Sequence, residues 1–332
     1  MSYTPAGNLT STSGINHLAT VWYNRRALDQ LKKRFRFYNA GEPDMVPRRS
    51  GKTVQWFRYT LLAANTSAAS EGAVGSSNTL ATTTVSGTVS EYADFITVST
   101  LLDETAIDPI VTNAAEQLGY SGGLSVDTLV RNEFDGNSGA VLSPGTLGAF
   151  ATVDDLRRCK ALLEGLDIRP KDERYYYCVL HPYIIYDIKS DNTAGGYIDL
   201  MKAAYMGAKD SADFLAGAAN PFDEPVGVVE NIKIWATTNV TSSGSAPNAL
   251  YSGYVVGRGA VGVVDLQGSG PSKVEDPSKQ QFRINVIRGG PQIADPAGMI
   301  GAAVSYRYVF VPKTLDSTNF RYRIFKADAS LV

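Results

Sequence analysis

The longest periodic pattern of apolar positions in the chain runs from Asp108 to Phe134 and predicts a single long helix. Asp108 is placed to cap its N-terminus, and Pro109 suits the first helical position because its missing N–H costs nothing there. At about 1.5 Å per residue the helix would be roughly 40 Å long. Apolar or small residues recur every three or four positions, as one helix face requires: Ile110, Val111, Ala114, Ala115, Leu118, Gly122, Val126, Leu129 and Val130.

Three glycines interrupt this pattern. Gly119, Gly122 and Gly123 are poor helix formers, each costing up to ~1 kcal/mol. One interpretation is that they let another backbone approach the helix closely. The alternative is a kink, or a break into two helices.

The chain before the long helix has the character of an extended arm and a hairpin. Residues 1–14 are small and polar, which predicts a segment that is disordered or ordered only on a partner. Leu18 to Phe35 predicts an amphipathic helix, followed by the linker AGEPDMVPRRSG. The apolar side of that helix carries Leu18, Val21, Trp22, Leu28, Leu31 and Phe35, and its polar side carries Arg25, Arg26, Lys32, Lys33 and Arg34.

Two strands are predicted next, Lys52–Leu62 and Thr79–Val98, because aromatic and β-branched residues dominate both. The stretch between them consists of small residues with a single charge, Glu71. Together they predict a long hairpin with a flexible tip. An isolated hairpin is marginal in water, so we expect this one to lie on another surface. Ser99–Ala106 predicts a short helical lead-in to the long helix.

The chain after the long helix predicts a compact mixture of helices and strands. Thr152–Gly165 is a well-signalled helix, with Thr152 as its cap and acidic residues in its first turn. A buried strand follows and ends in a turn at His181-Pro182, and Tyr197–Phe214 is partly helical. Strand-rich segments then run to the C-terminus. Few helices among mixed strands predict the α+β class.

Charge is unevenly distributed along the 332 residues, although the net charge is only −2. Residues 21–60 hold ten Lys or Arg against three acids, so that segment carries +7 and the remainder −9. Each of these charges taken alone is consistent with a solvated helix face. Taken together they predict a basic arm that lies on an acidic surface, of its own chain or of a neighbour, or that faces nucleic acid.

The remaining composition excludes several classes of protein. Cys159 and Cys178 lie among apolar residues and predict a pair of buried thiols in a reducing compartment. No cysteine or histidine spacing matches a zinc site. The N-terminus has no signal-peptide pattern, and no apolar run is long enough to span a membrane. We therefore expect synthesis in the cytoplasm and no membrane partner.

Two short segments match the sequence motifs of nucleotide-binding sites but lack the neighbouring elements that such sites need. Residues 257–262 read GRGAVG, but no helix is predicted to begin there to meet a pyrophosphate. Residues 50–53 read SGKT, but the first glycine of a P-loop would fall at Val46. Both are predicted to be turns. With only His17 and His181 in the chain and no paired carboxylates, the sequence predicts no catalytic residue, no metal site, no cofactor, and therefore no enzyme.

The order of these parts resembles the HK97 fold of tailed-phage major capsid proteins, and four segments resemble the N4-gp56 family of major capsid proteins. The resemblance covers nearly the whole chain and is strongest from about Thr20 to Phe134. The segments are TVWYNRRALDQLKKRFRFYN, PRRSGKTVQWFRYTLLAANT, TLATTTVSGTVSEYADFITVSTLLDETAIDPIVTNAAEQLGYSGGLSVDTLVRNEF and FRINVIRGGPQIADPAGMIGAAVSYRYVF.

The resemblance implies a division of the chain into five parts. Residues 1–50 would be the N-terminal arm, 51–98 the E-loop hairpin, and 99–150 the P domain with its spine helix. Residues 151–280 would form the A domain, and 281–332 would return to the P domain as C-terminal strands. No stretch precedes the arm that has the length of the scaffolding segment of some relatives, so a separate scaffold or none is expected.

The resemblance also implies a function. The chain would assemble into hexamers and pentamers of an icosahedral shell around packaged dsDNA, in a virion made in a bacterial host. Its partners would be further copies of itself, a portal protein at one vertex, and scaffold or decoration proteins. The first alternative is a tail or decoration protein of low oligomeric order, and the second alternative is an enzyme. We expect the contacts between subunits to use Arg25, Arg26, Lys32, Lys33, Arg34, Arg48, Arg49, Trp56, Phe57, Tyr59 and Glu71.

Overall fold

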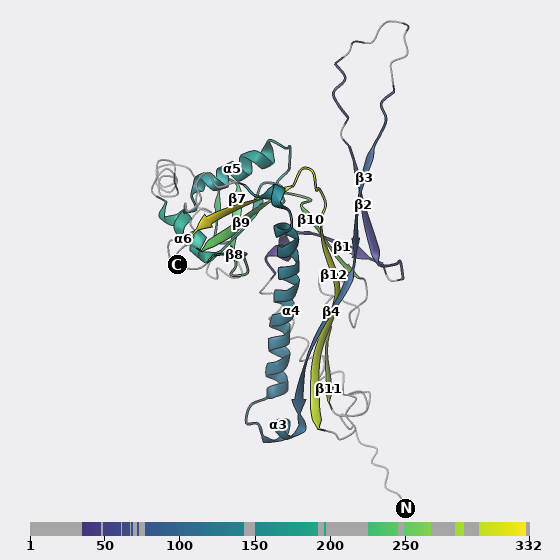
Figure 1. Cartoon of the computed structure of the whole chain (residues 1–332), viewed down its shortest axis with the longest axis vertical. Coiled ribbons are helices and arrows are strands. Elements are labelled where there is room, and N and C mark those ends of the chain that lie inside the picture. The colour runs from purple at the N-terminus through teal and green to yellow at the C-terminus, as the bar shows by residue number, and fades with distance from the viewer. Residues whose placement is uncertain are drawn as a thin grey trace, which may run out of the picture.

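The computed structural model describes residues 35–47, 49–60, 62–66, 68, 72, 77–142, 150–191, 196, 225–244, 249–266, 283–288 and 299–329. These residues form a long narrow part and a compact part, with a two-stranded hairpin standing beyond the body (Figure 1). The predicted helix at residues 18–35 lies almost entirely outside the described residues, and the predicted helical stretch Tyr197–Phe214 lies wholly outside them.

The predicted long helix exists as α4, Ile110–Asp135, with 26 residues. At 1.5 Å per residue it is roughly 39 Å long. It runs unbroken through its three glycines, which are all buried, so the alternative of a break into two helices was wrong. The predicted cap at Asp108 was also wrong. Pro109 is the N-cap, and its carbonyl accepts the N–H groups of Thr112 and Asn113, so the helix begins after it.

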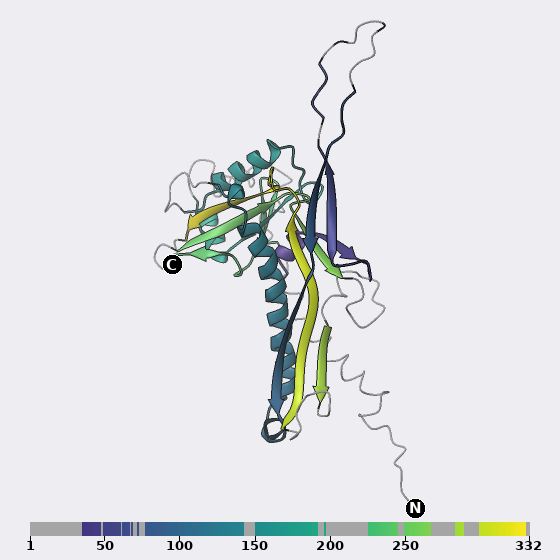
Figure 2. The same cartoon turned by 45° about the vertical axis from the view of Figure 1, so that its right-hand side comes forward.

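Helix α4 lies along a long sheet of five strands (Figures 1 and 2). The central strand is β12, Ile300–Thr314, which pairs antiparallel with β4 (Ser90–Ser99), β10 (Val261–Leu266) and β11 (Arg283–Arg288). Strand β1 (Glu42–Val46) pairs parallel with β10. The short helix α3, Thr100–Thr105, leads from β4 toward α4 at the far end of this part.

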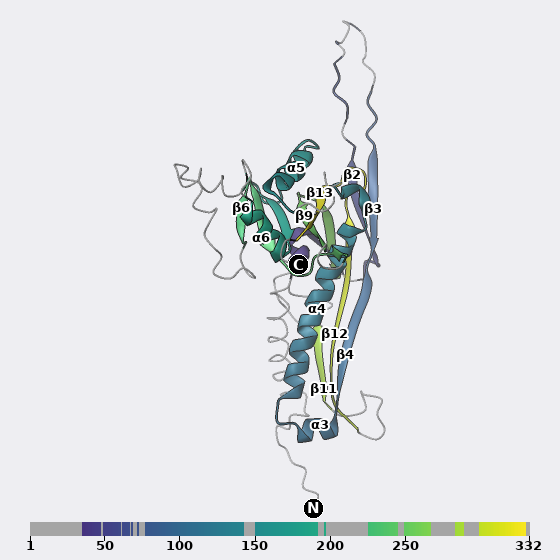
Figure 3. The same ribbon diagram turned by 60° about the vertical axis from the view of Figure 1, so that its left-hand side comes forward.

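The compact part is a second sheet in the order β13–β9–β5–β7–β6, with β8 paired to β9. Its strands are β5 (Tyr176–Leu180), β6 (Gly227–Val229), β7 (Ile232–Ala236), β8 (Ser242–Ser243), β9 (Leu250–Val256) and β13 (Tyr322–Asp328). Helices α5 (Val153–Glu164) and α6 (Pro182–Ser190) pack against it (Figure 3).

Two hydrophobic cores meet at β5, which is buried along its whole length. Tyr176, Cys178 and Leu180 point into a core shared with α5 and α6. Tyr177 and Val179 belong to the other core, shared with α4 and β12. The middle strand of the compact sheet therefore joins the two parts of the molecule into one body.

Several local signals were predicted correctly. Helix α5 begins at Val153, and the N–H and hydroxyl of Thr152 both donate to the Asp155 carboxylate, 3.0 and 3.1 Å away. Residues 257–260 form the turn between β9 and β10, and residues 50–52 form the turn before β2. Both cysteines are buried and free, as predicted.

Pairing between distant strands was predicted less well. The single strand predicted at Thr79–Val98 is two strands, because β3 (Thr82–Thr88) pairs with β2 (Thr53–Tyr59) while β4 leaves to pair with β12. The predicted domain boundary near residue 280 does not follow the sheets. Strand β10 belongs to the long sheet and β13 to the compact sheet. The turn at His181-Pro182 is the start of α6, with Pro182 in its first turn and the His181 ring accepting the Tyr183 N–H.

Candidate assembly surfaces

The hairpin exposes one face and covers the other, because side chains alternate along β2. Val54 and Trp56 are half-buried against the long sheet. Phe57 and Tyr59 point outward and are 66% and 62% exposed. Leu62 and Leu80, farther along the hairpin, are exposed as well. We call Phe57, Tyr59, Leu62 and Leu80 the hairpin patch.

Trp56, Phe57 and Tyr59 were all expected to need a neighbouring subunit for their burial, and for Trp56 this is corrected in part, because its own chain already half-buries it. Its indole packs within its own chain against the buried cluster of Val46, Val89, Val264 and Val309. The period of two along a strand separates Trp56 from Phe57 and Tyr59, and the sequence already contained that signal. Of the three aromatic residues, Phe57 and Tyr59 are the exposed ones, whereas Trp56 is partly covered by its own chain.

A second exposed apolar surface lies at the opposite end of the molecule, around α3 (Figure 1). Leu101 and Met299 are 72% and 69% exposed, and Leu102 and Ile107 are exposed too. The Thr100 N–H donates to the Met299 carbonyl, which holds the two segments together. We call Leu101, Leu102, Ile107 and Met299 the α3 tip. Exposed acids surround it: Asp103, Glu104 and Asp108.

Sequence reasoning missed the α3 tip because an apolar residue in a predicted helix is normally assigned to a core. The available signal was the shortness of the segment. A helix of six residues with two adjacent leucines cannot turn both of them toward the same sheet. None of the six residues of α3 is buried.

The root of the N-terminal arm is the one-turn helix α2, Phe37–Ala40, and Asp127 of α4 holds its N-terminal end. The Asp127 Oδ1 atom accepts the backbone N–H groups of Arg36, Phe37 and Tyr38, at 2.9, 2.7 and 3.1 Å. Oδ2 accepts from the Asn239 side chain at 3.2 Å. Burial raises the pKa of Asp127 to about 6, and these hydrogen bonds oppose that rise.

The other end of α2 is held by Lys171, which lies in the compact part. Its Nζ donates to the carbonyls of Ala40 and Gly41 at 2.7 and 2.6 Å. Burial lowers the pKa of Lys171, and nearby Glu42 partly opposes this. A carboxylate at the N–H end and an ammonium at the carbonyl end match the unpaired groups that every helix leaves at its termini.

Only some of the predicted contact residues are described. Arg49 is exposed, in the turn before β2, with a φ of 66°. The hairpin carries Trp56, Phe57 and Tyr59. The others lie outside the described residues: Arg25, Arg26, Lys32, Lys33, Arg34, Arg48 and Glu71.

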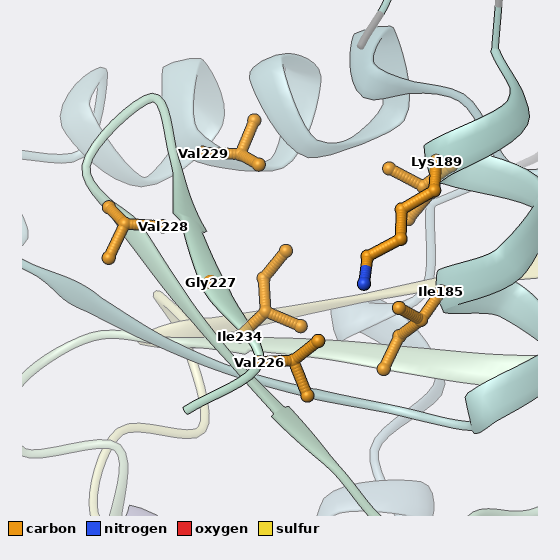
Figure 4. A pocket seen from close by; sticks show the side chains of 8 residues that line it. Ile185, Lys189, Val226, Gly227, Val228, Val229 and Ile234 are labelled. Atoms are coloured by element: carbon orange, nitrogen blue, oxygen red, sulfur yellow. The ribbon is translucent and has the colours of Figure 1, made fainter. Parts of the chain in front are cut away.

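Two hollows lie in the described part of the structure. An apolar cavity of about 20 Å³ lies between α6 and β6, lined by valine and isoleucine side chains with Lys189 beside them (Figure 4). It has room for little more than one water. A larger cleft of about 720 Å³ lies between the hairpin base and the compact part. Its Asp316 is paired with Arg58 and Arg321, and the rest of its charged lining is Glu42, Asp167, Arg169 and Arg258.

Two further findings concern metal binding and membrane spans. Among the described residues, no group of three His, Cys, Asp or Glu side chains is placed to hold a metal ion. No helix in the described ranges is long and apolar enough to cross a membrane.

Solved structures with the same architecture are phage capsids. The chain aligns with the capsid of Ralstonia phage GP4 at a TM-score of 0.60 and 12% identity, covering 87% of each chain. It aligns with the acidic stable capsid structure of Helicobacter pylori bacteriophage KHP30 at 0.58 and 12% identity, covering 88% of this chain and 91% of that chain. The Cyanophage Pam1 capsid matches at 0.56 and 15% identity, covering 85% and 86%.

The chain has the fold of a phage capsid protein. It is a mixed α+β fold, as predicted, and the likeness extends over most of the length of both chains in each comparison. No protein-family model matches the chain, and no curated protein matches it by sequence. The resemblance to the N4-gp56 family is therefore not confirmed.

Proposed function

We propose that the chain is the major capsid protein of a tailed bacteriophage, and that it assembles with copies of itself into the shell that encloses dsDNA. The observation that carries this proposal is a fold shared over nearly nine-tenths of the chain with phage capsids. Within it, the hairpin corresponds to the E-loop of the HK97 fold. Helix α4 with the long sheet corresponds to the P domain, and the compact part to the A domain.

The exposed surfaces support self-association. A soluble protein seldom leaves several large apolar side chains exposed together without a partner for them. Phe57 and Tyr59 would each bury ~150–250 Å² of surface if covered by a neighbour. The hairpin patch and the α3 tip lie at opposite ends of the molecule (Figure 1), so one copy can contact neighbours on two sides. Many such contacts per subunit make assembly cooperative.

The charges support a role for the arm in these contacts. The basic residues at 25, 26 and 32–34 would face an acidic neighbouring surface or the packaged DNA. The α3 tip is one acidic surface that fits, because Asp103, Glu104 and Asp108 are exposed there and residues 92–130 include no Lys or Arg. Two like-charged tips would repel each other, whereas a basic segment would be attracted.

The finer parts of the proposal follow the same resemblance. Hexamers and pentamers would be the units of the shell, a portal protein would occupy one vertex, and scaffold or decoration proteins would bind separately. The arrangement favours a structural role over catalysis. The second candidate, a tail or decoration protein, shares the exposed apolar surfaces but would stop at a small oligomer.

Electron microscopy of the purified chain tests the proposal. We expect closed shells or capsomers, and small oligomers alone would favour the tail or decoration alternative. The sharper variant removes the hairpin tip from Ala63 to Asn78 and joins the strands with Asn-Gly, a sequence suited to a two-residue hairpin. The body should keep its circular dichroism spectrum while assembly is lost. Normal shells from this variant would show that the hairpin tip does not join subunits.

A further inference from the structure

The base of the hairpin is attached to the body at two points on its inward face. The first is Trp56, whose indole lies between two glycines. The second is Arg58, which pairs with Asp316 in the loop between β12 and β13. Both side chains come from β2 and are two residues apart, so they project from the same face of the strand.

The Trp56 slot has no room for larger residues. A Cβ placed on Gly262 of β10 would lie 2.8 Å from the indole Cζ2 atom and 3.0 Å from the Leu315 side chain. A Cβ on Gly87 of β3 would lie 3.3 Å from the indole Cζ3 atom. One glycine is on the hairpin and the other is on the body. The indole therefore fills the space between them and fixes how closely the two approach.

The second attachment is a buried carboxylate that serves two arginines. Asp316 is 4% exposed, and its Oδ2 atom pairs with Arg58 and, at 3.7 Å, with Arg321. Its Oδ1 atom accepts the N–H groups of Thr318 and Asn319, at 3.1 and 2.9 Å, so the carboxylate itself cannot turn. A charge held this firmly in a covered position orients its partner more strictly than a surface ion pair does.

We propose that Trp56 and Asp316 are positioning residues that fix the direction of the hairpin within a single chain, before any neighbour binds. The outward face of the same strand carries Phe57 and Tyr59, so the direction of the hairpin decides where these side chains are presented. The consequence for shells rests on the proposed function: if the hairpin joins subunits, its direction sets the angle between them. Weakening the two attachments then changes the size or regularity of the shell rather than preventing assembly.

A distance measured within one chain tests the direction without reference to shells. Nitroxide labels on Thr84→Cys in β3 and Ala161→Cys in α5 report the hairpin relative to the compact part. The native cysteines are buried, so the labels attach to the introduced ones. Doubly labelled chain is diluted in a large excess of unlabelled chain, so that pulsed electron paramagnetic resonance records only distances within one chain.

We expect one narrow distance distribution in the parent chain. Gly262→Ala displaces the indole, and Asp316→Asn removes the charge but keeps an acceptor for the two N–H groups, so each should shift and broaden the distribution. Gly87→Ala is the graded variant and should have a smaller effect, because its Cβ is less crowded. Glu91→Gln removes an exposed ion pair with Arg307 and is the matched control, with no change expected.

Folded Gly262→Ala and Asp316→Asn chains with the parent distribution would overturn the proposal. If Gly262→Ala does not fold, Asp316→Asn alone decides, because Asp316 is outside the hydrophobic cores. Electron microscopy then tests the proposed function separately from the direction of the hairpin. A parent chain that forms no shells contradicts the proposed function but leaves the distance measurement as valid evidence on the hairpin direction.

Discussion

Strands β2 and β5 have similar compositions and opposite environments. Both are rich in aromatic and β-branched residues, and both predict strands. Strand β5 is buried on both faces, between two cores. Strand β2 is covered on one face only, and its other face carries two exposed aromatic rings. The same kind of sequence therefore builds the core in β5 and leaves two aromatic rings exposed in β2.

The difference lies in what surrounds each strand. Strand β5 has paired neighbours on both sides and packing layers above and below, so each of its side chains meets other side chains of the chain. Strand β2 pairs only with β3 among the described residues. If the hairpin joins subunits, changes in the core should destroy folding, and changes on the outer face of the hairpin should destroy only association.

The largest effect is expected in the core. Leu118→Asp places a carboxylate on the buried face of α4, where Leu118 is 1% exposed. Losing a buried leucine costs ~2–5 kcal/mol, and an unpaired buried charge adds to that, which is comparable with the whole stability of a domain. We expect insoluble or unfolded protein by circular dichroism. Leu162→Asp, on the exposed side of α5, is the matched control and should fold; a folded Leu118→Asp chain would contradict the assignment of this core.

The next effect concerns association alone. Phe57→Ser with Tyr59→Ser removes the two exposed rings of β2 and leaves Trp56 in its slot. We expect unfolding by urea to occur at the same concentration as in the parent chain, while shells no longer form in light scattering and electron microscopy. The same pair of changes at Leu162 and Tyr186, which are also exposed, should leave assembly intact. Loss of assembly in both double variants would show a general effect of surface polarity instead.

Several parts of this structure follow from local sequence signals. The extent of α4 follows from its 3.6-residue period, and the start of α5 follows from Thr152 and Asp155. The split of the residues 79–98 between two sheets does not follow from the sequence, because it depends on β12, which lies more than two hundred residues later. The sheets that β10 and β13 join also depend on residues far away in the sequence.

The exposure of side chains on the candidate surfaces follows only in part from the sequence. Strand alternation separates the covered Trp56 from the exposed Phe57 and Tyr59, so the sequence contains that distinction. The α3 tip breaks the rule that apolar side chains are buried, and residues at sites of association are where such a rule is expected to fail. Asp127 could not be predicted as the partner of the arm, because its donors are about ninety residues away.

A smaller loss of stability is expected at the root of the arm. Asp127→Ala leaves three N–H groups without their acceptor, two of them buried and one part-buried, and a buried unsatisfied group costs ~1–3 kcal/mol. We expect a loss of roughly 3 kcal/mol or more in urea unfolding of the unassembled chain. Asp127→Asn keeps an acceptor oxygen and should lose less than half as much. Equal losses in the two variants would mean that the charge matters more than the hydrogen bonds.

The effect of Asp265 depends on pH. Burial raises its pKa to about 8 from 3.8, and the Tyr38 hydroxyl, which donates to Oδ2 at 3.2 Å, partly opposes the rise. Because the folded state holds the proton more tightly, Asp265 stabilises the fold at low pH, and that contribution is lost as the pH rises toward 8.

Measurements between pH 7 and 8 report mainly on this group, because that range lies above the pKa of Asp127, which burial raises to about 6, and above that of His181, which burial lowers from 6.5. The free energy of unfolding should fall by at most about 1.4 kcal/mol per pH unit. Asp265→Asn resembles the protonated form and should remove this slope. A slope that persists in Asp265→Asn would assign it to another group.

The smallest effect is expected from the basic arm. Arg25→Glu, Arg26→Glu and Lys32→Glu together reverse three charges that we propose to face acidic neighbours such as the α3 tip, or DNA. Each exposed ion pair contributes only ~0.2–1 kcal/mol, but the loss is repeated in every subunit. Dissolved ions screen the attraction between charges more than about 8 Å apart at physiological salt. Assembled parent shells should therefore dissociate more readily as salt is added. The triple variant should dissociate more readily at low salt and respond less to added salt. The control variant Arg158→Glu with Lys326→Glu reverses exposed charges in the compact part and should keep the salt response of the parent. If shell stability changes neither with salt nor in the triple variant, the arm does not take part in the contacts between subunits.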